Sequence, residues 1–323
     1  MLRRLLGNPI LRRVLSSLGT LAGVSVLIFI ILRAIPGNQI TATFGTEAAA
    51  LTPEQMAQLK AYYGLDKPLF IQFFSWLGNV LSGNLGVSIR AHQSVASLTA
   101  QSLPVTFELA IITIVLALLI GIPLGMLSAS KPDSIRDAIG QGVGLAGLSI
   151  PAFLLATTLV TVLAAVFRFN PNGAGYAYFT QNPVLNLKQM LLPSCVLAFG
   201  IAAPIMRTTR TAVLDIRSED FIRTAKAKGI STRRLQLSHV LGNALVPIAT
   251  MTGLQFGYLL GGAVVVEQVF SLPGIGRQVL TGFQQKEYAV VQSTVLIIAL
   301  AFVIVNLLTD LAYRIIDPRV RAE

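Results

Sequence analysis

The sequence predicts an all-α polytopic membrane protein with six transmembrane helices. Of its 323 residues, 54% are hydrophobic and 12% are charged, whereas about a quarter of the residues in a soluble domain carry charge. The mean hydropathy is +0.70. A helix crosses a bilayer with about 20 apolar residues, and windowed hydrophobicity identifies such segments. They lie near residues 11–35, 104–129, 139–167, 190–212, 244–270 and 289–313.

The first apolar segment follows basic residues, as the apolar part of a signal peptide would. Its run from Val14 to Leu32 is about 19 residues long, more than the roughly 7–15 of a signal peptide and enough for a span. No small-residue cleavage site follows, because the chain continues Arg-Ala-Ile-Pro-Gly at residues 33–37. We therefore expect an uncleaved first transmembrane helix. The preceding basic residues are Arg3, Arg4, Arg12 and Arg13.

The segment between the first two spans is too long for a simple connection. Residues 52–55 read Thr-Pro-Glu-Gln, a capping box with proline at the first helical position, so we expect a helix that reaches about Tyr63 and ends at Gly64. Residues 68–81 are strongly apolar, but about 14 residues do not cross a bilayer. We expect this second segment on the outer surface, in the interface or against other helices.

Several spans contain prolines or closely spaced glycines. Pro123, Pro151 and Pro204 interrupt backbone hydrogen bonding inside spans two, three and four, which is tolerated where neighbouring helices or water satisfy the freed carbonyl. Span five repeats glycine every fourth residue, so another helix can approach it closely. Tight packing within one bundle and a face for a partner or pore wall explain this repeat equally well. The repeated residues are Gly253, Gly257 and Gly261.

The distribution of basic residues predicts that both termini are cytoplasmic. With six spans the termini share one side, and 17 of the 25 lysines and arginines belong to that side, as the positive-inside rule requires if it is the cytoplasm. The same rule accounts for the net charge of +11, so no nucleic acid partner is expected. Tyr176, Tyr178 and Phe179 of the second outer loop are placed as interfacial aromatics.

The sequence lacks the residues that several chemistries need. It contains neither the Gly-x-x-x-x-Gly-Lys-Ser/Thr of an ATP-binding loop nor the His-Glu-x-x-His of a metal helix. His92 and His239 lie far apart, and the single cysteine, Cys195, lies in an apolar run and is expected to be a small core residue. We expect no catalytic residue and no metal or cofactor bound by this chain.

Three acidic residues lie in or near the spans: Glu108, Glu267 and Asp310. Ionisable residues within a membrane are functional candidates, but these are isolated and do not form the pattern of a proton relay. Structural pairing with nearby arginines explains them at least as well. A standalone channel or an ion-coupled secondary transporter is therefore disfavoured, although it stays the alternative.

The most informative segment is the basic inner loop between spans four and five, residues 207–243. Ser218 is expected to cap a short helix, and Gly229 to end it. Acidic residues in the first turn and basic residues in the last suit the helix dipole. These residues are Glu219 and Asp220 at the start and Lys226 and Lys228 at the end.

A second short helix is expected to follow in this loop, capped by Ser231. Phe221 and Ala225 are four residues apart and share a face of the first helix. The loop is therefore expected to form two helices joined at a glycine, which offer an aromatic and small side chains to a partner. A solvated connector is the alternative.

Residues 221–229, Phe-Ile-Arg-Thr-Ala-Lys-Ala-Lys-Gly, together with residues 239–247, resemble the coupling loop of bacterial ATP-binding-cassette importer permeases. More narrowly, they resemble the dipeptide/oligopeptide/nickel permease family, in which Arg223-Thr224-Ala225 commonly replaces the general Glu-Ala-Ala. The proline of the general motif is replaced by Gly242, and a proline follows at Pro247. Three further blocks agree in order and spacing: residues 33–37 with 63–68, residues 267–277, and residues 306–310 through 317–319.

The resemblance implies a type I importer permease fold and a function that depends on partners. Residues 1–95 would hold the first transmembrane helix and an external helical segment, residues 96–313 the permease core, and residues 314–323 a cytoplasmic tail. A second, homologous permease would complete a heterodimer in the bacterial inner membrane. Two cytoplasmic ATPases would bind ATP and Mg, and a periplasmic binding protein or lipoprotein would deliver the substrate.

The resemblance also implies roles for particular residues. Pro273, Gly274 and Gly276 would lie in an external loop or gate, with a plain turn as the alternative. Dipeptides, longer peptides, glutathione, cell-wall peptides and nickel complexes are all family substrates, of which peptides are the commoner class. The residues that would contact an ATPase are Asp220, Phe221, Arg223, Thr224, Ala225, Lys226, Lys228 and Gly229.

Overall fold

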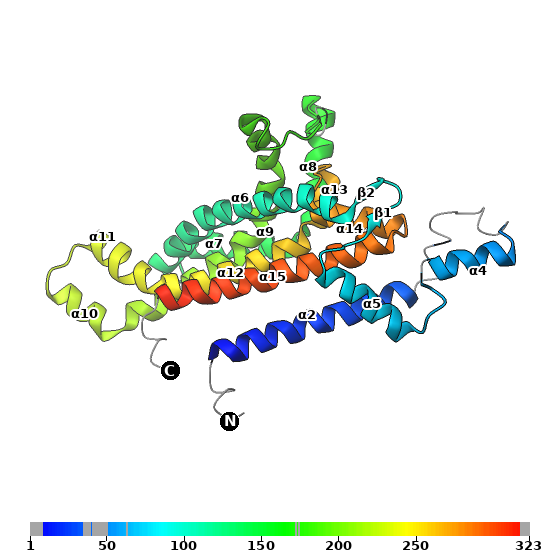
Figure 1. The fold of residues 1–323 in the computed structure, drawn as a ribbon. Coiled ribbons are helices and arrows are strands. Elements are labelled where there is room, and N and C mark those ends of the chain that lie inside the picture. The colour runs from blue at the N-terminus through cyan, green and yellow to red at the C-terminus, as the bar shows by residue number, and fades with distance from the viewer. Residues whose placement is uncertain are drawn as a thin grey trace, which may run out of the picture. The chain divides into compact units, whose positions relative to one another are not determined.

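The computed structural model describes residues 9–34, 40, 51–62, 64–171, 173 and 175–316, and it consists mainly of helices (Figure 1). Among these residues five helices are long and apolar enough to cross a membrane, or six if a bent pair counts as one span. The predicted all-α polytopic fold is confirmed. Arg3, Arg4, Pro36, Gly37, Tyr63 and residues 317–323 lie outside the described residues, as do the side chains of Arg12 and Asp310.

The chain divides into two compact units. The first comprises residues 1–105 and 273–303, and the second comprises residues 106–272 and 304–323. Two long helices, α6 (Val95–Ser130) and α15 (Tyr288–Ile316), contribute one end to each unit. The first unit also holds α2 (Pro9–Ala34), α4 (Pro53–Tyr62), α5 (Leu69–Leu81), β1 (Val87–Ser88), β2 (Gln93–Ser94) and α14 (Ile275–Gln284).

The helices predicted between the first two spans are present. The backbone amide of Gln55 donates to Thr52 Oγ1 at 3.2 Å, and the amide of Thr52 donates to Gln55 Oε1 at 2.9 Å, which is the expected capping box of α4. Gly64 has a φ of +65° in the turn that follows α4. Helix α5 packs against α2, which is one of the positions expected for an apolar helix too short to span.

The region around Pro273 and Gly274 is not a plain turn. Gly274 precedes α14, and both Gly274 and Gly276 are buried. Gln278 holds α14 in the first unit, because its Nε2 donates to Thr99 Oγ1 at 3.2 Å and to Thr294 Oγ1 at 3.0 Å. The alternative of a simple connection is therefore wrong, while the external gate stays a prediction.

The second unit contains the third span, which is broken. Residues 135–149 and 152–167 form two helices that meet at an angle of 92°, although the sequence predicts one continuous span. The break lies at Ile150 and Pro151, because a residue that precedes proline is driven out of helical geometry, and Ile150 has an extended ψ of 115°. The second unit's helices are α7 (Ile135–Ser149), α8 (Ala152–Phe167), α9 (Pro183–Ser218), α10 (Asp220–Ala227), α11 (Thr232–Arg234), the π-helix η2 (Leu235–Leu241), α12 (Gly242–Gly262) and α13 (Val264–Val269).

Helix α9 lies at the centre of the second unit, with 61% of its most apolar window buried. Glycines of neighbouring helices allow close approach to its backbone. A Cβ on Gly125 of α6 would lie 2.6 Å from the carbonyl oxygen of Met206, and a Cβ on Gly147 of α7 would lie 2.7 Å from that of Phe199. Side chains at these two glycines would therefore force the helices apart.

The glycine repeat of α12 serves packing inside the chain at one position at least. A Cβ on Gly253 would lie 2.0 Å from Thr309 Cγ2 of α15. Gly257 is buried, whereas Gly261 is exposed with no atom within 4 Å of a Cβ there. Cys195 is exposed on α9, so the expectation of a core cysteine is wrong: its side chain points outward from the face that α9 buries.

Candidate protein-interaction site between α9 and α12

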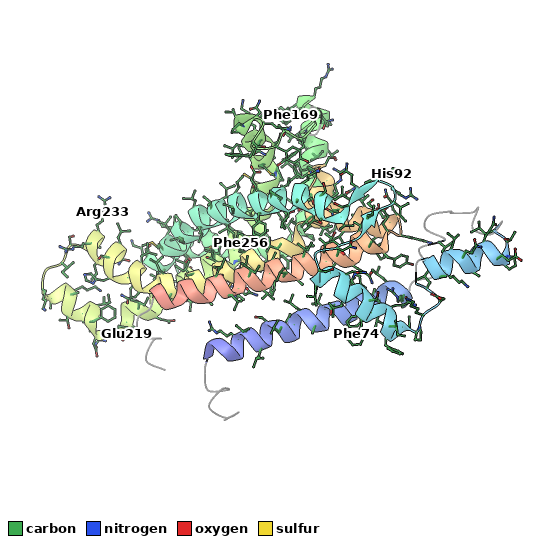
Figure 2. All side chains as sticks on the ribbon, in the orientation of Figure 1. Phe74, His92, Phe169, Glu219, Arg233 and Phe256 are labelled. Carbon is green, nitrogen blue, oxygen red and sulfur yellow. The ribbon has the colours of Figure 1, made fainter. Side chains whose placement is uncertain are left out.

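The segment that joins α9 to α12, residues 219–241, is called the elbow below. It consists of α10, a turn at Gly229, α11 and η2, so the predicted pair of short helices is present. Glu219 and Arg233 lie on its two limbs (Figure 2). The predicted N-cap is wrong: Ser218 ends α9, where its hydroxyl donates to the carbonyl oxygen of Asp215 at 2.6 Å. Glu219 occupies the N-cap position without a side-chain hydrogen bond.

The predicted stop at Gly229 is confirmed. Gly229 has a φ of +74°, a left-handed conformation that glycine adopts at little cost. Its amide donates to the carbonyl oxygen of Lys226 at 3.0 Å. The amide of Ile230 donates to the carbonyl oxygen of Ala225 at 3.3 Å. These bonds satisfy the last carbonyl groups of α10 and turn the chain into α11.

The inner face of α10 holds the elbow to the rest of the second unit. Ile222 is 0% exposed and Ala225 is 7% exposed, and α10 packs against η2 and α9. Leu235 and Val240 of η2 are also buried. Ala225 therefore does not present its side chain on the surface together with Phe221, as their spacing suggested, because it packs within the chain.

The outer face of α10 presents an aromatic residue among charges. Phe221 is 45% exposed, so it is available to a partner, and aromatic residues are common among those that dominate binding at protein interfaces. Arg223 pairs with Asp220 at 3.3 Å, but both side chains are largely exposed, so the pair contributes little to stability. Exposed basic residues outnumber exposed acidic ones on the elbow, and they are Arg223, Lys226, Lys228, Arg233 and Arg234.

Arg217 joins the base of the elbow to two other helices. One of its terminal nitrogens donates to the carbonyl oxygen of Ala129 at the end of α6, and the other donates to Gln236 Oε1 in η2 at 2.8 Å. Charge-assisted hydrogen bonds of this kind are the stronger ones in proteins. The base of the elbow is therefore attached to α6 and α9 together.

A buried ion pair near the same end of α9 was not predicted from the sequence. Arg210 Nε donates to Asp137 Oδ1 at 2.8 Å, and Arg210 Nη2 donates to Asp137 Oδ2 at 2.7 Å. Ser128 also donates to this carboxylate, as does Gln141 at 3.1 Å. The bidentate pair fixes the start of α7 against α9. No local motif signals a pair that is 73 residues apart in the chain.

A cavity of about 960 Å³ lies beside the elbow, between α9 and α12. It is lined by polar and charged side chains, including Arg207, Asp215 and Asn243, and by the two prolines Pro204 and Pro247. Polar groups at span depth are tolerated where they line a water-filled path or a protein contact. The prolines at 204 and 247 lie inside α9 and α12, which continue through them.

The half-buried carboxylate of Glu108 has polar partners other than arginine among the described residues. Asn186 Nδ2 donates to Glu108 Oε2 at 3.3 Å and to the Tyr176 hydroxyl at 3.0 Å, and that hydroxyl lies 3.5 Å from Glu108 Oε2. Burial raises the pKa of Tyr176 above its usual range, so the phenol keeps its proton. Tyr176 therefore makes hydrogen bonds within the chain, and its place among interfacial aromatics stays a prediction. Glu267, in turn, accepts a hydrogen bond from Thr106 Oγ1 at 2.6 Å.

Among the described residues no group of three or more His, Cys, Asp or Glu side chains could hold a metal ion. Contact between the elbow and a partner stays a prediction for the exposed residues, whereas Ala225 is buried within the chain. The residues predicted to form an external gate, Pro273, Gly274 and Gly276, belong to the other unit.

Two family models match the chain. The model described as "Binding-protein-dependent transport system inner membrane component" matches residues 121–322, and the corresponding N-terminal model matches residues 5–110. A probable peptide ABC transporter permease protein of Sinorhizobium fredii is 36% identical over 98% of this chain and 100% of its own length. The glutathione transport system permease protein GsiC of Escherichia coli is 35% identical over 97% of this chain and 99% of its own length. A solved structure of an amino acid ABC transporter aligns over 69% of this chain and 94% of its own, at 15% identity and a TM-score of 0.49.

Proposed function

The chain belongs to the binding-protein-dependent transport system inner membrane components, and from this premise we propose that it forms one half of the pathway of a peptide importer driven by cytoplasmic ATPases. It is a multi-pass protein of the bacterial inner membrane and a permease of the ATP-binding-cassette importers, not an enzyme. ATP hydrolysis takes place on partner ATPases of the family. The type I importer permease fold expected from the resemblance follows from the same membership.

Short peptides are the proposed substrate class, with glutathione among them. Relatives named for peptides and for glutathione match this chain over nearly its whole length, which supports the class rather than one member. A second, homologous permease is proposed to complete a heterodimer. A periplasmic binding protein or lipoprotein delivers the peptide to that dimer.

The elbow is proposed to receive the movement of an ATPase. The observation that carries this proposal is the division of α10 into a buried inner face and an exposed outer face that carries Phe221. The inner face and Arg217 attach the elbow to the second unit, so a push on the outer face reaches α6 and α9. The excess of basic residues on the elbow suits an ATPase cleft lined by carboxylates.

The proposed orientation places the elbow and both termini in the cytoplasm. The basic residues of the inner loops support it. Replacing Cys195 with alanine and introducing a cysteine at Lys226 allows labelling in intact cells. A reagent that cannot cross the membrane should leave this thiol unlabelled until the cells are opened, and labelling in intact cells would refute the orientation.

Phe221→Ala tests the role of the elbow in the assembled importer. We expect peptide uptake and substrate-stimulated ATP hydrolysis to fall at least tenfold, while the amount of chain in the membrane is unchanged. Phe179→Ala is the matched control, because Phe179 is 51% exposed in the loop before α9 and not on the elbow. Uptake by the purified chain without ATPases would instead support a standalone channel or an ion-coupled carrier. Equal activity of the two variants would refute the docking role.

A further inference from the structure

A second cavity, of about 480 Å³, lies within the first unit. Its walls come from the end of α2, the α4–α5 turn, α5 and the beginning of α15. The described residues that line it include three cations and no carboxylate; the cations are Arg33, Lys60 and Lys67. Such a lining favours a ligand with negative charge.

The guanidinium of Arg33 is held in place by neighbours inside this cavity. It lies 3.6 Å from the centroid of the Phe29 ring, and its Nε donates to Gln72 Oε1 at 3.1 Å. Gln72 in turn donates from Nε2 to the carbonyl oxygen of Lys67 at 2.8 Å. The cation is therefore positioned before any ligand arrives, which lowers the entropic cost of binding.

Two buried hydrogen-bond donors in the cavity wall lack an acceptor among the described residues. They are Trp76 Nε1 and Gln292 Nε2. Gln292 is only 4% exposed, so bulk water does not satisfy its amide. Because buried donors are nearly always hydrogen-bonded in native proteins, two such donors beside three cations indicate a missing ligand that is rich in acceptor oxygens.

An apolar surface adjoins the cavity. Leu69, Phe70 and Phe74 of α5 are 61%, 64% and 65% exposed, and Phe74 is labelled on α5 in Figure 2. Ile30 and Ile31 near the end of α2 are 59% and 45% exposed. Helix α5 has 13 residues, so it lies along an interface rather than across it. A ligand that fills the cavity with an anionic group can cover this surface with hydrocarbon.

We propose that the cavity binds the phosphate of an anionic phospholipid headgroup, with the acyl chains along the exposed faces of α2 and α5. Phosphate oxygens accept from Arg33, Trp76 and Gln292, and Lys67 contributes charge at the rim. A free phosphate or a peptide carboxylate offers the same acceptors, but it leaves the apolar faces of α2 and α5 uncovered. The tie of α5 to α2 is therefore expected to depend on the lipid.

The single tryptophan of the chain makes this proposal measurable. The full chain, placed in phosphatidylcholine nanodiscs, is titrated with phosphatidylglycerol that carries bromine near the head of one acyl chain. We expect brominated phosphatidylglycerol to quench half of the Trp76 fluorescence at some mole fraction in the nanodisc. Brominated phosphatidylcholine should need a mole fraction at least tenfold higher to reach the same quenching. Equal quenching by the two lipids would overturn the proposal.

Variants separate the site from general lipid contact. Arg33→Gln/Lys67→Gln should abolish the preference for phosphatidylglycerol, and Gln292→Leu, which removes one donor at similar size, should reduce it about threefold. Arg168→Gln/Lys188→Gln is the matched control, because these exposed cations lie outside the cavity. Persistence of the preference in Arg33→Gln/Lys67→Gln would overturn the proposal. Inorganic phosphate or triglycine that restores Trp76 fluorescence at millimolar concentration would assign the cavity to a soluble anion and would overturn it as well.

Discussion

Replacing Gly229 with tryptophan tests whether the elbow docks against a partner. Gly229 has a φ of +74°, and no atom lies within 4 Å of a Cβ built on it. A side chain there meets open space, so its cost to folding is the left-handed backbone alone, about 1–2 kcal/mol. Bulk inserted into a packed interface costs about 1–3 kcal/mol, which weakens an ATPase contact by about 5- to 140-fold at 1.4 kcal/mol per factor of ten.

The assay compares membrane abundance, co-purification of the ATPases and ATP-driven uptake of a labelled peptide. Gly229→Asn should behave as the parent chain, because asparagine tolerates the left-handed region. Gly229→Ala bears the same backbone cost as Gly229→Trp but adds only a methyl group. We expect uptake to be nearly normal in the alanine variant and at least fivefold lower in the tryptophan variant, with all variants equally abundant in the membrane.

Gly83→Trp supplies the matched control. Gly83 has a φ of +86° and equally open space around a Cβ, but it follows α5 and lies outside the elbow. Full uptake by Gly229→Trp would refute the docking model. Equal losses in both tryptophan variants would show that left-handed strain, not a lost contact, lowers the rate.

Three further predictions concern packing and buried charge. Asp137→Asn leaves Arg210, which is 22% exposed, without its carboxylate. We expect the free energy of unfolding to fall by roughly 2–4 kcal/mol, which is measured as a lower midpoint of thermal unfolding in detergent. An unchanged midpoint would contradict this prediction. Glu108→Ala removes the acceptor of the Tyr176 hydroxyl, whereas Asn186 keeps its bonds to Tyr176 and Ala177. Burial of the freed hydroxyl should cost about 1–3 kcal/mol in the same measurement, and Glu108→Gln, which keeps an acceptor, should lose less. Gly253→Ala should lower the midpoint of thermal unfolding, because the added methyl group meets the Thr309 side chain. Adding Thr309→Ala should restore part of the lost midpoint. If it restores none, the loss in Gly253→Ala does not arise from the contact with Thr309.

Local sequence patterns predicted much of the helical architecture. The capping box at Thr52, the short apolar helix ending at Leu81 and the stop at Gly229 were all correct, because each depends on residues that are neighbours in the chain. The spans were found for the same reason, since a window of apolar residues is a local property.

Features that depend on contacts between distant residues were missed. The sequence singles out Pro151 but does not predict the 92° bend there. Hydropathy averages over both helices, and a proline inside a span does not always break it, as Pro204 in α9 shows. The partners of Glu108 and Arg210 lie many residues away. Cys195 and Ala225 were given the wrong environment, because composition does not tell which face of a helix another helix covers.

In the candidate site, too, the sequence predicts local features but not contacts between distant residues. The exposed aromatic of α10 and the basic character of the elbow follow from residues 219–234 themselves. The attachment through Arg217 to Ala129 and Gln236 requires three helix ends to meet, which no pattern along the chain displays. The sequence therefore predicts the exposed face of the elbow, but not how the elbow is attached to α6 and η2.

The length of α9 has a mechanical consequence. Its 36 residues correspond to about 54 Å at 1.5 Å per residue, well beyond the roughly 30 Å of the hydrocarbon layer. At one end it meets the elbow, and near the other Asn186 holds Tyr176 and Glu108. Rotating such a rod by about 5° around its midpoint displaces each end by about 2.4 Å in opposite directions. A displacement of about 2.4 Å at the elbow end of α9 is therefore enough to break or remake hydrogen bonds at its other end.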